Sequence, residues 1–121
     1  METVLINGKE YRFEFNGNTI TFFAQVFGED LLSLTFEAQK KKQILLENNR
    51  LQKLAYITNV QAETSGWREA KKRLSMDNYM DWCEKFAPGT WLTGTPATII
   101  LTGWANGLVT ETEAKNAESQ Q

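Results

Sequence analysis

Two residue types that carry much of enzyme chemistry are scarce in this sequence: histidine is absent, and the only cysteine is Cys83. Without imidazole, the usual base that activates a serine or cysteine nucleophile is missing. A single thiol forms neither an internal disulfide nor a cysteine zinc cluster. These absences exclude most hydrolytic and redox mechanisms, so the sequence predicts a binding or assembly protein that is not an enzyme and uses no metal or cofactor.

Long uncharged apolar runs are also scarce. Residues 91–109 carry no charge over 19 positions, but polar and small residues dilute their hydropathy below that of a membrane-spanning helix. We expect a buried helix there and no membrane partner. The segment Met1–Ile6 has no basic residue ahead of its apolar part, so we also expect no secretory leader.

Proline and glycine, at two and eight in 121 residues, are too few for a collagenous or disordered chain. This length supports one domain with its own core. Residues 110–121 are acidic and contain no large apolar side chain, so they have nothing to bury. We therefore expect a single domain over 1–109 and a disordered acidic tail over 110–121.

The strongest local pattern is at the start of the chain, where alternating apolar segments flank Asn7-Gly8. This dipeptide accepts the positive φ angles of a type I′ turn, so a two-residue loop pairs Ile6 with Lys9. Alternation then places five side chains on the inner face of the hairpin. They are Val4, Ile6, Tyr11, Phe13 and Phe15.

Capping residues and helical periodicity divide the rest of the domain. We expect helix starts at Asn18, Asp30, Ser75 and Thr95, the last followed by Pro96. The predicted fold class is therefore α+β, a two-stranded antiparallel hairpin packed on a bundle of about four to five α-helices.

The breaks between these helices are set by glycine, proline and loss of periodicity. Gly28 ends the first helix, a loop or kink lies in 41–49, and a break lies at 64–66. Residues 67–73 are short and charged and give no clear pattern. The helix that begins after Ser75 is expected to extend to Ala87, before Pro88-Gly89.

Each helix also has an expected buried stripe. In the first it is Ile20, Phe23, Ala24 and Phe27, and in the middle helix it is Leu51, Leu54, Ala55 and Thr58. After Ser75 it is Met76, Tyr79, Met80, Cys83 and Phe86. In the last helix it is Ala97, Ile100, Leu101, Trp104, Ala105 and Leu108. Because Ile99 lies off that stripe, the last helix is expected to be apolar nearly all round.

Charge is unevenly distributed. Residues 1–39 have a net charge of −4 and residues 40–73 a net charge of +6, while the whole chain is −2. The basic block is typical of a solvated helical face or of a surface that attracts an acidic partner. It leaves nucleic-acid binding as a weaker alternative, because no recognisable nucleic-acid motif accompanies it.

Few side chains form a constellation typical of a chemical site. Cys83 lies on the apolar stripe of a helix, where it is expected to act as a small buried hydrophobe. Asp77 and Asp81 have the i, i+4 spacing of a cation site, but a solvated helix edge is the favoured interpretation. The four tryptophans are in excess of what core packing explains, which favours an aromatic partner-binding surface.

Five segments of the sequence together resemble one known family. They are INGKEYRFEF at 6–15, NTITFF at 18–23, GEDLL at 28–32, LAY at 54–56 and NYMDW at 78–82. The likeness covers residues 4 to 86 and is to the tail assembly chaperones of long-tailed phages and prophages of Gram-positive bacteria.

The resemblance implies an α+β domain without catalytic residues. It implies binding to the phage tape measure protein in the host cytoplasm, assistance to assembly of tail-tube subunits, and absence from the mature virion. Family members are often made in two lengths by translational frameshifting, and this chain resembles the short form.

Two other functions remain open. The first is a small structural virion subunit, such as a head–tail connector or tail completion protein, which would be present in purified particles. The second is a nucleic-acid-binding regulator that uses the basic segment 40–73. For the chaperone, the candidate partner-binding residues are Trp91, Ile99 and Trp104, because the last helix needs cover from a client or from a second copy of the chain.

Overall fold

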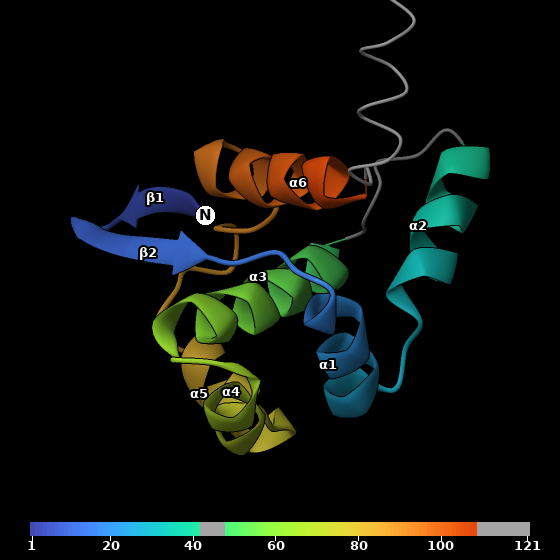
Figure 1. Ribbon diagram of the computed structural model, residues 1–121. Coiled ribbons are helices and arrows are strands. Elements are labelled where there is room, and N and C mark those ends of the chain that lie inside the picture. The colour runs from blue at the N-terminus through green and yellow to red at the C-terminus, as the bar shows by residue number, and fades with distance from the viewer. Residues whose placement is uncertain (42–47, 109–121) are drawn as a thin grey trace, which may run out of the picture.

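Figure 1 shows the computed structural model, which describes residues 1–41 and 48–108. The predicted α+β class is confirmed: the described residues form one antiparallel hairpin and six helices, where four to five were expected. The bounds are β1 Glu2–Ile6, β2 Lys9–Phe13, α1 Asn18–Phe27, α2 Leu31–Lys40, α3 Asn48–Glu63, α4 Trp67–Arg73, α5 Met76–Cys83 and α6 Thr95–Gly107.

The hairpin has the register that its turn predicts. Asn7 and Gly8 have φ angles of 54° and 81°, as a type I′ turn requires, and Ile6 pairs with Lys9. The expected inner face is also confirmed, because all of its members are buried or pack against the core. They are Val4, Ile6, Tyr11, Phe13 and Phe15.

Helix α3 is the centre of the fold, since β2, α1, α4, α5 and α6 all pack against it. Its expected stripe is confirmed within a wider buried surface. That surface consists of Leu51, Leu54, Ala55, Tyr56, Ile57 and Thr58. The hairpin is attached here because the Glu14 N–H donates to the Thr58 carbonyl at 2.9 Å.

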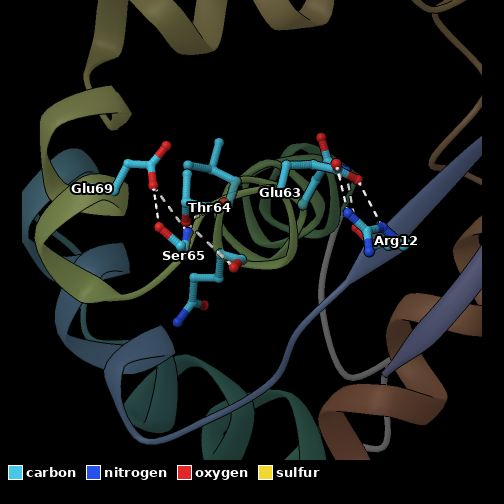
Figure 2. Close-up of polar contacts among 8 residues, drawn as sticks. Arg12, Glu63, Thr64, Ser65 and Glu69 are labelled. Carbon is cyan, nitrogen blue, oxygen red and sulfur yellow. Dashed lines mark hydrogen bonds and ion pairs between the residues drawn. The ribbon is translucent and has the colours of Figure 1, made fainter.

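The C-terminal end of α3 is held on both sides, as Figure 2 shows. Arg12 of β2 donates to both carboxylate oxygens of Glu63, with Nη2 to Oε2 at 2.9 Å and Nε to Oε1 at 3.3 Å. On the other side, Ser65 donates its backbone N–H and its hydroxyl to Glu69 Oε2, at 3.0 and 2.6 Å. The predicted break at 64–66 lies between α3 and α4. Helix α4 occupies residues 67–73, for which the sequence gave no clear pattern.

The predicted N-cap of α1 is wrong. Asn18 is already helical, and the N-cap position is held by Gly17, which has no side chain to cap with. The Asn18 N–H donates instead to Asn16 Oδ1 at 2.9 Å, and the same oxygen accepts from Gln61 Nε2 at 2.8 Å. The sequence does not show the contact with α3 that recruits Asn16. Gly28 ends the helix with φ of 68°, as expected.

The buried face of α1 is rotated from the expected one. Phe23 is fully buried as predicted, but Ala24 is exposed, and Phe22 and Thr19 are buried in its place. The Thr19 hydroxyl donates to Gln61 Oε1 at 2.8 Å. A polar residue therefore belongs to the interface with α3, which a pattern of apolar residues does not reveal.

Helix α2 begins as expected: Asp30 Oδ1 accepts from the N–H groups of Leu32 and Ser33 at 3.1 and 3.4 Å. The helix packs beside α1 and is linked to α6 by Trp104 Nε1, which donates to Thr35 Oγ1 at 3.1 Å. The loop or kink expected in 41–49 lies mostly on residues 42–47, outside the described residues.

Helix α5 has the expected N-cap, with Ser75 Oγ accepting from the Asn78 N–H at 3.0 Å. The helix ends at Cys83 rather than at Ala87, because a turn follows Cys83.

Its buried face differs from the predicted stripe. Tyr79 and Trp82 are buried, whereas Met76 and Met80 are 48% and 59% exposed. Trp82 takes the inner position because its indole nitrogen donates to Asn59 Oδ1 of α3 at 3.0 Å.

Helix α6 begins one residue before the expected start, because Gly94, with φ of 87°, occupies the N-cap position and Thr95 is helical. Most of its predicted stripe packs inward, but Ala105 is exposed. The expectation that this helix is apolar on nearly every side is wrong. Its outer face carries Thr98, Thr102, Ala105 and Asn106.

Two expectations about the whole chain can be placed against the described residues. None of the helices in 1–41 and 48–108 is long and apolar enough to cross a membrane. The tail expected at 110–121 lies outside the described part of the chain.

Candidate partner-binding surface

The single thiol is half-buried beside polar side chains. Gln52 Nε2 donates to Cys83 Sγ at 3.1 Å and to the Tyr79 hydroxyl at 3.1 Å. Burial raises the pKa of the Cys83 thiol and raises that of Tyr79 to about 12. Both groups are therefore protonated at neutral pH, and a protonated thiol is a poor nucleophile.

The paired carboxylates Asp77 and Asp81 lie exposed on α5. Among the described residues, no group of three or more His, Cys, Asp or Glu side chains is placed to hold a metal ion. The solvated helix edge favoured from the sequence matches this placement.

The tryptophans are distributed differently from the sequence-based expectation. Trp82, Trp91 and Trp104 are at most 5% exposed, and only Trp67 is at the surface, at 48%. Trp91 stacks on Trp82 with ring centres 5.5 Å apart. Core packing therefore accounts for three of the four tryptophans.

Two of the three candidate binding residues are consequently core residues. Trp91 and Trp104 are 1% and 3% exposed, so in this fold neither presents a ring to a partner. Ile99 is half-buried and packs against the core. The premise that Trp91 and Trp104 are left over once the core is filled is wrong.

Large apolar side chains do reach the surface elsewhere. Those on the helices and the loop before α6 are Phe36, Trp67, Met76, Met80 and Leu92, and those on the N-terminal strand and its start are Met1 and Leu5. Trp67 borders one hollow of the surface and Met76 borders a neighbouring one. Their position beside these hollows distinguishes them from singly scattered apolar residues.

These two hollows lie between α1 and the segment 66–76 that contains α4. One has a volume of about 50 Å³ and is lined by Trp67 and Ala70, and the other has about 230 Å³ and is lined by Leu74 and Met76. Phe22 of α1 lines both, so the two hollows are neighbours. We call the pair of hollows the α1–α4 groove. Its lining consists of Asn16, Asn18, Phe22, Gln25, Val26, Gln61, Gly66, Trp67, Ala70, Lys71, Leu74, Ser75 and Met76.

The border of the groove is basic. Lys71 lines it directly, and the Arg68 guanidinium lies over the Trp67 ring, 4.6 Å from its centre. The acid on α4 is Glu69, which is engaged by Ser65 and by Arg73 at 2.7 Å. Hydrogen bonds from Ser65, helped by the charge of Arg73, hold the Glu69 pKa below its usual value, so it is ionised at neutral pH.

Other basic residues of the 40–73 block form ion pairs within the domain. Lys53 Nζ lies 2.8 Å from Glu29 Oε1, and Arg50 Nε lies 3.5 Å from Glu29 Oε2. Among the described residues of this block, Arg50, Lys53 and Arg73 are therefore paired with carboxylates, whereas nucleic-acid binding favours basic side chains gathered on one face beside aromatic ones.

A separate hollow of about 280 Å³ lies beside β2 and α3. Its lining has charges of both signs, including Lys9, Lys85, Glu10 and Glu63, together with Asn59. Asn59 already donates to the Arg12 carbonyl and accepts from Trp82. Mixed charge and satisfied polar groups give this hollow no preference for one class of ligand.

Comparison of the chain with protein-family models, curated proteins and solved structures finds no match.

Most residues that form the α1–α4 groove were not singled out from the sequence. Phe22 was off the expected α1 stripe, and Met76 was expected to be buried. The groove exists because α1 and α4, which are forty residues apart in sequence, both pack against α3. One signal was available, namely Trp67 at the head of a short charged segment.

Proposed function

We propose that the protein is a tail assembly chaperone: a non-catalytic protein of the host cytoplasm that binds the tape measure protein of a long-tailed phage while tail-tube subunits assemble around it. Two lines of support meet here. The resemblance of residues 4 to 86 names the family, and the surface has the character that holding an apolar client requires.

The observation that carries the proposal is the exposure of Trp67 and Met76 beside the α1–α4 groove. The domain closes its own core, with Phe13, Phe23 and Trp91 at most 1% exposed. Neither Trp67 nor Met76 belongs to that core. Covering apolar surface stabilises an association by roughly 25 cal/mol per Å² before ordering costs are subtracted, so a partner that covers them gains affinity.

The experiment that tests the proposal is co-expression with the tape measure protein encoded in the same phage genome. We expect the tape measure protein to move from the insoluble to the soluble fraction and to co-purify with the chain. An unrelated soluble protein of similar size, expressed at the same level, is the control. If the tape measure protein is as insoluble with this chain as with that control, the chaperone proposal is wrong.

The alternative of a structural virion subunit makes the opposite prediction for purified particles. A chaperone is present in infected or induced cells and absent from gradient-purified virions, whereas a connector or completion protein is present in both. Quantitative mass spectrometry of both samples separates the two functions.

A further inference from the structure

We infer that the α1–α4 groove receives one amphipathic helix of the client, with an apolar face directed into the groove and acidic residues along its edges. This inference rests on the proposed function, since it states which part of a tape measure protein the chaperone holds and where.

The walls of the groove have the spacing of helix faces. On α1, Phe22, Gln25 and Val26 are at positions i, i+3 and i+4 and line the same hollow. On the other wall, Trp67, Ala70 and Lys71 are at positions i, i+3 and i+4 of α4, the first two in the smaller hollow and Lys71 in the larger. Side chains at these intervals form rows along a helix, so two rows face the space in which a third helix packs.

The length of the walls sets the length of the occupant. Helix α1 has ten residues and α4 has seven, which correspond to about 15 and 10 Å at 1.5 Å per residue. An occupant of two to three turns covers this length. It presents anchors at i, i+3 or i+4, and i+7, the pattern by which helices bind in apolar grooves.

The lining sets the chemistry of the occupant. Phe22 is buried, Val26 and Leu74 are half-buried, and Trp67 and Met76 are exposed, so each hollow has an apolar side. The rest of the lining is polar and includes Asn18, Gln25 and Gln61. Unbranched methionine adapts to the shape of a partner. No acidic side chain is among the described residues that line either hollow, and Lys71 and Arg68 supply positive charge. The charge complement is a helix with acidic edges.

A second copy of the chain fits less well than a client helix. The acidic helix of a second copy is α5, on which Asp77 and Asp81 are exposed. The exposed Glu84 follows directly after the end of this helix. Outside the groove itself, that helix presents one strongly exposed apolar anchor, Met80. One anchor does not fill a groove that is two turns long.

The test uses fluorescein-labelled synthetic peptides of three helical turns and fluorescence anisotropy. The first peptide has leucines at i, i+3, i+4 and i+7 with glutamates on both flanks. The second has lysines in place of the glutamates, and the third has the composition of the first in an order that destroys the apolar face. We expect the first to bind at least about tenfold more tightly than either of the others, with affinity that falls as salt rises.

Substitutions locate the site. Met76→Glu and Lys71→Glu should each weaken the first peptide by about fivefold or more, because one places a carboxylate on the apolar wall and the other inverts the charge at the edge. The matched controls are Leu5→Glu on β1 and Lys40→Glu on α2, which make the same changes at exposed positions away from the groove. Circular dichroism and thermal melting establish that all four variants are folded.

Equal affinity of the groove variants and the control variants for the first peptide would overturn the inference. So would a preference for the lysine peptide. A wild-type dimer that Met76→Glu converts to a monomer, with no peptide bound, would also overturn it, since the groove then holds a second copy.

If no peptide binds but the tape measure protein is solubilised, the inference fails and the proposed function stands. If the first peptide binds in the groove and the tape measure protein stays insoluble, the groove stands and the proposed function fails.

Discussion

Gly103 occupies the point where α6 comes closest to the chain that leaves the hairpin. A Cβ atom at this position would lie 2.4 Å from Cε2 and 2.8 Å from Cζ of Phe15, distances that no real side chain tolerates without movement. Glycine in the interior of a helix ordinarily destabilises it by about 0.5–1 kcal/mol relative to alanine. Glycine is nevertheless required at position 103, because a side chain there would prevent α6 from packing this close to Phe15.

We predict that Gly103→Ala destabilises the domain by about 1–3 kcal/mol, because the overpacked Phe15 ring has to move. Gly107→Ala is the matched control on the same helix, since its Cβ would lie at an ordinary 3.8 Å from Phe15 Cβ. It should be neutral or slightly stabilising. Urea titrations of the three proteins measure these differences.

A second substitution identifies the cause. If the clash with Phe15 is responsible, Gly103→Ala should cost much less when it is introduced together with Phe15→Leu, as a double-mutant cycle shows. Equal stability of wild type and Gly103→Ala would mean that α6 and Phe15 are not in close contact in solution.

The starts of the helices show which caps can be predicted from neighbouring residues and which cannot. Asp30 and Ser75 cap α2 and α5 as the sequence predicts, because each side chain bonds to backbone groups two or three residues ahead. The start of α1 is set differently, by Asn16, which bonds to its own helix and to Gln61 of α3 at the same time. Such a cap belongs to the contact between two helices, and the sequence near Asn18 does not contain it.

We predict that Asn16→Ala destabilises the domain by about 1–2 kcal/mol, since it leaves the Asn18 N–H and the Gln61 amide without their acceptor. Asn18→Ala should change the stability by less than about 0.5 kcal/mol, because this exposed residue is helical and makes no capping bond. Thermal melts of the two variants decide between the caps. A larger loss of stability for Asn18→Ala than for Asn16→Ala would show that Asn18 is the cap, as the sequence suggests.

The hairpin was predictable in full and the helix faces only in part, for the same reason. The turn at Asn7-Gly8 fixes the register through neighbouring residues alone, and with it the inner face that contains Phe13. Which side of α1 or α5 is buried depends on where α3 lies. This non-local condition buries Phe22 and leaves Met76 exposed, and the candidate groove, which depends on both residues, was therefore not predictable.

At the scale of the whole molecule, opposite charges link distant parts of the chain. Glu29, in the connection between α1 and α2, lies against Lys53 and Arg50 of α3. The hydrogen bond from Lys53 holds the Glu29 pKa below its usual value, as Ser65 does for Glu69. A carboxyl whose folded pKa is depressed stabilises the fold above its unfolded pKa, and this contribution is lost as the pH falls through the folded pKa.

We predict that stability falls as the pH is lowered below about 4.5, the ordinary value for a glutamate, with Glu29 as one contributor. Glu29→Gln should lower the urea midpoint at pH 7 by an amount worth less than about 1 kcal/mol. The difference from wild type should shrink at pH 3, where the native carboxyl is increasingly protonated. A difference that is the same at both values would show that Glu29 acts through its shape and not through its charge.

The packing of β1 against α6 has a consequence for how the protein is made. These elements are the first and the last of the described fold, and they lie side by side. During translation the hairpin forms early, because its contacts are local, but the surface that α6 covers stays bare until residues 95–107 have left the ribosome. Until then the nascent chain exposes the aromatic and aliphatic groups that pack under α6 in the folded domain, and these groups can associate with other chains.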